Sequence, residues 1–226
     1  MSRFGGGRLA AWVGLVGILA AANYGARFLG SGATTTGNRD ALYTYGAAAS
    51  GLVFYGVFFF FVYLIAAADT DELFALRRPR AIGEAVGLAL AVFVAVTVWE
   101  GIVARLPLPQ SPTAEQGITP THWEPQHAGA YAMNFAVIAL LAPVVEELTF
   151  RGVGFRLLDE RYARWFAIGL IGIAFGLAHG LIEGLIVLVP FGAALAYLRA
   201  RTESTYPGMA VHATFNGIAL VYVILR

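Results

Sequence analysis

The stretch GLVFYGVFFFFVYLIAAA, residues 51–68, contains no charged side chain. A transmembrane helix needs about 20 predominantly apolar residues, so this run predicts a membrane span. Comparable runs lie on both sides of it, and the predicted spans are 9–29, 41–68, 81–104, 128–158, 163–181, 183–200 and 204–225. The predicted fold class is therefore all-α: a polytopic transmembrane helical bundle of about seven helices, or eight if residues 105–127 hold a further short or interfacial helix.

The composition agrees with a chain whose solvent is the lipid bilayer. Of 226 residues, 58% are hydrophobic and only 13% are charged, against about 25% charged residues in ordinary soluble domains. The formal net charge is +1, and the sequence shows no clustered basic face, so nucleic acid is not expected as a partner. The chain has no cysteine, which excludes disulfides, thiolate catalysis and cysteine-ligated zinc.

The placement of arginines predicts how the bundle is oriented. Arginines lie in the connections at 77–80, 156–164 and 199–201, and Arg3 and Arg8 precede the first span. Such positively charged segments stay in the cytoplasm, so we expect localisation in the cell membrane with a cytoplasmic N-terminus and an outside C-terminus. The first span has features of a signal peptide, but six further spans favour a retained helix.

Polar side chains within the apolar spans are concentrated in the last four. A charge at the bilayer centre costs about 2.5–3.5 kcal/mol on insertion scales, so such a cluster is a functional hypothesis. Counted from the connecting turns at 1.5 Å per residue, these polar groups reach comparable depths in their helices. We therefore expect them to converge near mid-membrane: Glu146, Glu147 and Arg151 of the fourth span, His179 of the fifth, and His212 and Asn216 of the seventh.

Two features predict how the helices pack around this point. The fourth span is longer than the bilayer requires, so we expect it to tilt or to kink at Pro143. A stripe of small residues on the fifth span permits close approach of a neighbouring helix: Gly172, Gly176 and Gly180. His179 directly precedes the last of these glycines, so we expect it beside a tight helix contact rather than facing lipid.

The residue types in this cluster suit hydrolysis by a general base, which removes a proton as water attacks a carbonyl. We assign Glu146 as the base and Glu147 as its support. Arg151, one turn from Glu147, keeps that carboxylate ionised, whereas burial and like-charge repulsion raise the proton affinity of its neighbour. His212 and Asn216 share one helix face and are candidates for donating hydrogen bonds to the oxyanion of a tetrahedral intermediate.

Three short motifs occur in order in the C-terminal half: EELTFR at 146–151, FGLAH at 175–179 and HATFN at 212–216. Together they resemble the motifs of the CAAX-processing and bacteriocin-processing family of intramembrane endopeptidases, the type II CAAX proteases. The resemblance implies a helical intramembrane fold, a water-filled site open to the cytoplasm and peptide-bond cleavage by a glutamate-activated water. The implied partners are membrane-associated peptide or protein substrates, lipid-modified or not.

The resemblance covers roughly residues 128–220. We therefore divide the chain into residues 1–127, which hold the N-terminal transmembrane helices and an outside loop, and residues 128–226, which form the catalytic core.

The resemblance also raises the question of a metal ion, because members of this family are often called metalloproteases. Glu146, His179 and His212 offer the oxygen and nitrogen ligands of a zinc site with one position left for water. In the alternative, a metal-free site, Glu146 and His179 bind the water directly. The zinc-protease pattern His-Glu-x-x-His is absent; we favour the metal-free site, with zinc as the alternative.

Two other functions agree with parts of the pattern. A catalytically silent binding or immunity protein of the same fold would sequester a peptide, but the intact set Glu146, His179 and His212 disfavours it. A proton-coupled transporter would use membrane-embedded Glu and His residues as a relay, but the sequence lacks the internal repeat expected of one. Taken alone, His212 and Asn216 also suit ordinary interhelical hydrogen bonding.

Overall fold

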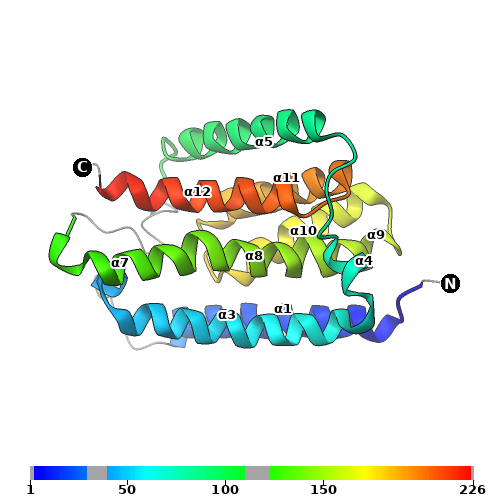
Figure 1. Cartoon of the computed structure of the whole chain (residues 1–226), viewed down its shortest axis with the longest axis horizontal. Helices are drawn as coiled ribbons and strands as arrows, with labels where there is room; N and C mark the ends of the chain where they lie inside the picture. The colour runs from blue at the N-terminus through cyan, green and yellow to red at the C-terminus, as the bar shows by residue number, and fades with distance from the viewer. Residues whose placement is uncertain (1–2, 30–39, 110–122, 225–226) are drawn as a thin grey trace.

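The computed structural model of the chain is a bundle of long helices lying side by side (Figure 1). It describes residues 3–29, 40–109 and 123–224. The N-terminal part contributes α1 (Gly6–Leu29), η1 (Asp40–Tyr43), α3 (Tyr45–Ala66) with its extension η2 (Ala67–Asp69) and α4 (Thr70–Phe74), and α5 (Ile82–Val103). After the long central rod described below come α10 (Arg164–Ala178), α11 (Leu185–Thr202) and α12 (Tyr206–Ile224).

These seven helical rods occupy the seven predicted spans. Within the described residues, five of them are long and apolar enough to cross a membrane, and α10 is a shorter apolar helix. Many large apolar side chains point outward, as lipid contact requires, including Phe60 on α3 and Leu90 on α5. The predicted all-α membrane bundle is confirmed. The additional helix considered for residues 105–127 falls largely outside the described residues, which show there only the short turn η3 (Pro125–His127).

The fourth span is a central rod that begins at η3 and continues through α7 (Ala128–Phe135), η4 (Ala136–Leu141), α8 (Ala142–Glu147), η5 (Leu148–Gly154) and α9 (Phe155–Asp159). The segments η4 and η5 are π-helical turns. Pro143 has no N–H to donate, and just before it the Ala142 N–H bonds to the Val137 carbonyl, five residues back. The irregularity expected at Pro143 thus takes the form of widened turns on both sides of α8, a feature often found at functional sites.

The central rod passes through the interior of the bundle. In Figure 1 it runs between the α1 and α3 layer on one side and α12 and α5 on the other. Every residue of η5 is buried, and this segment contacts α1, α3, α10 and α11. Polar side chains of α8 and η5 therefore point into protein rather than into lipid.

The helices α10 and α11 pack in close contact, as the glycine stripe predicts. A Cβ atom added at Gly172 would lie 2.7 Å from the Val189 carbonyl oxygen, and one added at Gly192 would lie 3.0 Å from the Gly172 Cα atom. Gly180 has a different role. Its φ of +67° ends α10, and an added Cβ there would lie 2.6 Å from the Cβ of Asn23 on α1.

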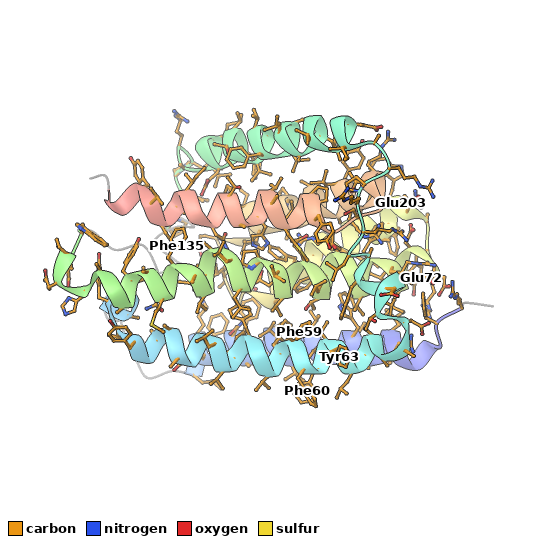
Figure 2. All side chains as sticks on the ribbon, in the orientation of Figure 1. Phe59, Phe60, Tyr63, Glu72, Phe135 and Glu203 are labelled. Atoms are coloured by element: carbon orange, nitrogen blue, oxygen red, sulfur yellow. The ribbon has the colours of Figure 1, made fainter. Side chains whose placement is uncertain are left out.

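The arginine-rich connections gather at one end of the bundle, which we call the arginine end. Figure 2 shows Glu72 and Glu203 at this end, where they pair with arginines. The N-terminus lies at the arginine end and the C-terminus at the opposite end (Figure 1). Which end faces the cytoplasm stays a prediction.

Candidate active site

The adjacent acids Glu146 and Glu147 end α8 and face different surroundings. Successive residues of a helix point about 100° apart, so one carboxylate enters the protein core while the other faces a cavity. Glu147 is fully buried, whereas the Glu146 side chain is 13% exposed. The sequence predicts two roles for the pair, and the structure gives them two environments.

Glu147 belongs to a buried polar network. Its Oε1 atom accepts a hydrogen bond of 2.7 Å from Arg151 Nη1 and lies 3.1 Å from His212 Nδ1. Arg151 is itself fully buried, donates to the Gly192 carbonyl at 3.0 Å and has its guanidinium 4.4 Å from the centre of the Phe175 ring. The predicted pairing of Glu147 with Arg151 is confirmed, and the network joins the central rod to α11 and α12.

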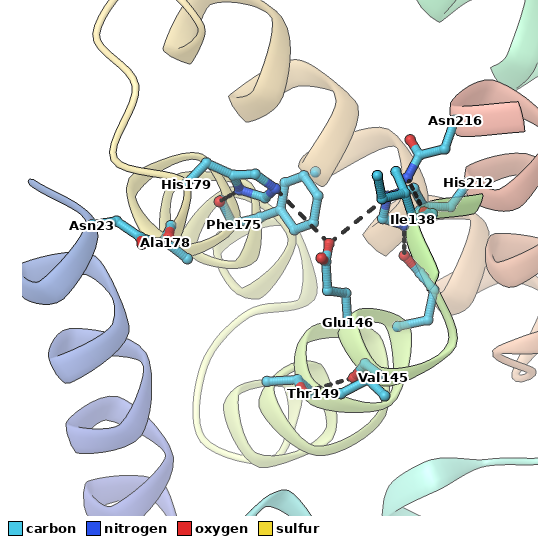
Figure 3. Close-up of polar contacts among 12 residues, drawn as sticks. Asn23, Ile138, Val145, Glu146, Thr149, Phe175, Ala178, His179, His212 and Asn216 are labelled. Atoms are coloured by element: carbon cyan, nitrogen blue, oxygen red, sulfur yellow. Dashed lines mark hydrogen bonds and ion pairs between the residues drawn. The ribbon is translucent and has the colours of Figure 1, made fainter. Parts of the chain in front are cut away.

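Glu146 faces the two histidines. Its Oε2 atom lies 3.9 Å from His179 Nε2 and 3.8 Å from His212 Nε2, as Figure 3 shows. Its other oxygen, Oε1, accepts a hydrogen bond of 2.9 Å from the hydroxyl of Tyr55 on α3. The Oε2 atom is buried and has no hydrogen-bond partner among the described residues. Oε2 and the two ring nitrogens therefore face one another at distances longer than a direct hydrogen bond.

Both imidazoles are held by their Nδ1 atoms. His179 Nδ1 lies 2.7 Å from the Phe175 carbonyl oxygen, and because a carbonyl only accepts hydrogen bonds, this nitrogen carries the proton. His212 Nδ1 faces the carboxylate of Glu147 at 3.1 Å and donates in the same way. In each ring, Nε2 is therefore the nitrogen available for the reaction, and this nitrogen faces Glu146.

The position of His179 depends on the end of α10. The predicted span reaches residue 181, but the helix ends at Ala178 and His179 is its C-terminal cap. Asn23 of α1 donates to the Ala178 carbonyl at 2.6 Å, and the Tyr24 hydroxyl donates to the Leu181 carbonyl at 3.0 Å. The first helix of the chain therefore fixes the loop that carries this histidine.

Asn216 completes the group of predicted site residues. It lies one turn after His212 on α12 and donates from Nδ2 to the Ile138 carbonyl at 3.0 Å. An amide nitrogen has two hydrogens, so one N–H and the Oδ1 atom are left over. The structure brings all six predicted residues together at the meeting point of the central rod, α10 and α12; their catalytic roles stay predictions.

Comparison with known proteins finds similarity in the part of the chain that holds most of these residues. Residues 128–218 match the family model described as "Type II CAAX prenyl endopeptidase Rce1-like". After this similarity, we call residues 128–218 the Rce1-like domain. The chain is also 26% identical over 92 residues to "Putative membrane peptidase YdiL" of Bacillus subtilis (strain 168). That match covers 41% of this chain and 38% of the relative, and no solved structure matches the chain.

The match confirms the resemblance seen in the three motifs, because all of them fall inside residues 128–218. The division of the chain at residue 127 and the catalytic role of residues 128–226 stay predictions. The site is not built from this domain alone: Tyr55 and Asn23, which contact it, come from α3 and α1.

A cavity of about 290 Å³ opens beside Glu146, lined by the Rce1-like domain and by the N-terminal helices. Its walls are largely apolar, with Phe54, Phe58 and Phe175 among them, and polar groups are few. Such a cavity, with few convergent polar groups on apolar walls, is typical of a ligand or substrate site. The polar groups include four predicted site residues and three from the N-terminal helices: Glu146, His179, His212, Asn216, Asn23, Tyr55 and Glu100.

Tyr55 is the site residue that the sequence analysis missed. It lies within an apolar run of aromatic residues on α3, and nothing in its local pattern separates it from Phe54 or Phe58, which line the same cavity. A three-dimensional contact across 91 residues of chain, the hydrogen bond to Glu146, distinguishes it.

The zinc alternative can be tested against the donor set of the Rce1-like domain. One carboxylate oxygen and two imidazole nitrogens are suitable zinc donors, and both imidazoles have the Nδ1 partners usual for metal ligands. Donors about 2.0–2.1 Å from a tetrahedral zinc are about 3.4 Å apart, less than the 3.8 and 3.9 Å that separate Glu146 Oε2 from the ring nitrogens. In the described part of the chain, no group of three such side chains has metal-binding geometry, so the residues as placed do not fit zinc.

Proposed function

We propose that this chain is an intramembrane endopeptidase in which Glu146 activates a water molecule to hydrolyse a peptide bond. One observation carries the proposal: Glu146 Oε2, which is buried and has no hydrogen bond to any residue that the structure describes, faces the Nε2 atoms of His179 and His212 at 3.9 and 3.8 Å. A water molecule about 2.8 Å from two such atoms matches this spacing. The family match and the membrane peptidase of Bacillus subtilis support the same class of reaction.

The attacking step follows from the hydrogen-bond roles of these atoms. The water donates one hydrogen to Glu146 Oε2 and the other to His179 Nε2, which leaves an oxygen lone pair for the substrate carbonyl carbon. Glu146 takes the first proton as the new carbon–oxygen bond forms. Tyr55 donates to Oε1 of the same carboxylate and so directs the other oxygen, Oε2, toward the water.

The second half of the reaction places charge on the substrate oxygen and a proton on the leaving amine. His212, protonated on both nitrogens, donates from Nε2 to the oxyanion, and the Glu147 carboxylate at Nδ1 stabilises that imidazolium. The unused N–H of Asn216 is the second donor in this proposal. When the carbon–nitrogen bond breaks, Glu146 returns its proton to the amine, so protons balance over the cycle.

The substrates we propose are membrane-associated peptides or proteins, with or without a lipid modification. The test is hydrolysis by purified protein in liposomes of a panel of membrane-bound peptides, each prepared prenylated and unprenylated, with and without a strong chelator. We expect cleavage that chelation leaves largely intact, since the proposed step uses no metal. Complete loss that zinc restores would reverse the preference for a metal-free site, and tight binding without cleavage would favour the silent binding protein.

Tyr55→Phe tests the one proposed site residue that lies outside the Rce1-like domain. Removal of the hydroxyl leaves Glu146 Oε1 without its hydrogen bond and frees the carboxylate to rotate. We expect kcat to fall about tenfold, the effect of about 1.4 kcal/mol on the barrier, with KM little changed. The measurement is steady-state cleavage of the best peptide of the panel.

Tyr63→Phe is the matched control, because Tyr63 lies two turns along α3 and is half exposed. We expect its activity to equal that of the unchanged protein. Equal rates for both variants would remove Tyr55 from the proposed mechanism.

The side to which the cavity opens is a separate question. Its lining residues Asn23, Glu100 and Leu181 lie toward the ends of their segments opposite the arginine end. If the arginine end is cytoplasmic, as we propose, the cavity extends toward the outer end of the bundle. This conflicts with the cytoplasmic opening that the family resemblance implies, so only one of the two expectations holds.

Labelling of single cysteines can decide between them, because the chain has no cysteine of its own. We expect a membrane-impermeant maleimide added to intact cells to label Leu106→Cys, beyond the end of α5, and not Arg78→Cys at the arginine end. Both positions are exposed, and both should react in opened membranes. The reverse pattern in intact cells would place the cavity end on the cytoplasmic side.

A further inference from the structure

A second cavity, of about 500 Å³, lies at the arginine end, away from Glu146. Segments far apart in the sequence line it: the start of α4 and the connection after it, α9, the start of α10 and the end of α11. Its charged residues are four arginines and four carboxylates: Arg77, Arg156, Arg164, Arg199, Asp71, Glu72, Asp159 and Glu203. The proposed hydrolysis uses none of them.

Arg199 is the unusual member of this group. Its residue surface is only 5% exposed, and its Nε atom has no hydrogen-bond partner in the described part of the chain. Its guanidinium carbon lies 5.8 Å from the centre of the Phe155 ring. Burial of an unpaired charge is costly, so a guanidinium held in this way is a candidate for binding an anion.

The carboxylates around the cavity are already engaged with other arginines. Glu72 pairs with Arg156 at 2.5 Å and Asp159 with Arg164 at 3.1 Å. Glu203 pairs with Arg80 at 3.3 Å. The remaining carboxylate, Asp71, is exposed at the rim. In each of these pairs the carboxylate binds an arginine other than Arg199.

Aromatic residues beside the cavity indicate its depth in the membrane. Tyr162 and Trp165 flank Arg164 and are 47% and 72% exposed. Trp165 stacks on Tyr197, two residues before Arg199, with 5.6 Å between ring centres. Exposed Trp and Tyr side chains are enriched at the headgroup level of a bilayer, where the phosphate groups of lipids are the abundant anions.

We propose that this cavity is a binding site for a phosphate group, with Arg199 as its principal ligand. A guanidinium matches phosphate oxygens with two parallel N–H donors, and such charge-assisted bonds are among the strongest hydrogen bonds in proteins. The phosphate belongs either to the headgroup of an anionic phospholipid or to a free phosphate ion, since both present the same oxygens. This inference does not depend on the proposed peptidase activity.

Thermal unfolding of the detergent-solubilised full chain tests the site. The probes are phosphatidylglycerol, phosphatidylcholine and inorganic phosphate, each titrated separately. We expect phosphatidylglycerol to raise the Tm by several degrees in a saturable way, because a ligand of the folded state stabilises it. In Arg199→Met we expect at least about tenfold weaker apparent affinity, since the charged donor is lost.

Arg201→Gln is the matched control, because Arg201 lies on the same helix turn but is exposed and pairs with Glu84 at 3.3 Å. We expect Arg201→Gln to keep the full rise in Tm. If Arg199→Met does not fold, Arg199→Lys replaces it; this variant retains the charge, so we expect it to keep part of the rise in Tm. A shift with phosphatidylglycerol alone identifies a lipid, and one that inorganic phosphate reproduces identifies the free ion. No shift with either anion, or an equal shift in Arg199→Met and Arg201→Gln, would overturn the proposal.

Discussion

Glu146→Gln is expected to lower the rate of peptide hydrolysis by about 10²–10⁴-fold, the usual contribution of a general base. Glutamine has nearly the same shape as glutamate, so the cavity and the contact with Tyr55 can persist. Its amide has no basic oxygen to take a proton from water. The measurement is single-turnover cleavage of a reconstituted peptide, which separates chemistry from binding and product release.

The binding step should survive this substitution. Glu146 is partly exposed and lines the cavity, and it does not stabilise the fold. We therefore expect peptide affinity and unfolding temperature to stay close to their original values. Glu84→Gln, on an exposed α5 carboxylate that pairs with Arg201, is the control and should keep full activity. Hydrolysis that continues unchanged in both Glu146→Gln and His179→Ala would eliminate the proposed mechanism.

Arg151→Met should destabilise the folded chain by about 3–5 kcal/mol, the cost of removing one partner from a buried ion pair. Methionine fills much of the arginine volume, so the loss comes mainly from charge. Glu147 would be left fully buried without its arginine partner, and the Gly192 carbonyl would lose its donor. Reversible unfolding in mixed micelles measures the effect, with peptide hydrolysis as the second readout.

A double variant distinguishes two causes of the lost stability in Arg151→Met, namely loss of charge pairing and loss of packing. Replacement of both members of a buried pair by apolar residues is often nearly neutral, so Arg151→Met combined with Glu147→Leu should recover most of the lost stability. The double variant should nevertheless be inactive, because Glu147→Leu removes the carboxylate at His212 Nδ1 that orients this ring. Full stability in the single variant Arg151→Met would show that the network does not hold the bundle together.

The sequence alone predicts much of the fold because the bilayer admits few solutions. Each crossing must satisfy its own backbone hydrogen bonds, so an apolar run such as 51–68 can only be a helix. Helix spacing also predicts local pairs. Glu147 and Arg151 are four residues apart and meet on one helix face. The convergence of Glu146, His179 and His212 follows from depth counted along antiparallel helices.

Counting residues along a helix gives the depth of a side chain, but it does not give the rotation of the helix about its axis or the partners of that side chain. The π-helical turns on both sides of α8 change the directions in which Glu146 and Glu147 point. No residue pattern in 136–154 predicts these turns. In the sequence, Tyr55 is one aromatic residue among several. Its hydrogen bond to Glu146 exists only because α3 packs beside the central rod. Arg199 and Arg201 illustrate the same limit, because they are only two residues apart. Arg199 is buried and forms no ion pair within residues 3–29, 40–109 and 123–224, whereas Arg201 is exposed and paired with Glu84.

By itself, then, the sequence determined the class of fold, the approximate positions of the helices and the residues that gather at one site, because hydrophobicity and helix spacing act locally along the chain. Only the tertiary structure decided which Glu146 oxygen is left without a partner, which N-terminal side chain reaches it and which arginine faces an open cavity. Those outcomes depend on how helices from distant parts of the sequence rotate and pack against one another, and that information is not contained in any one segment.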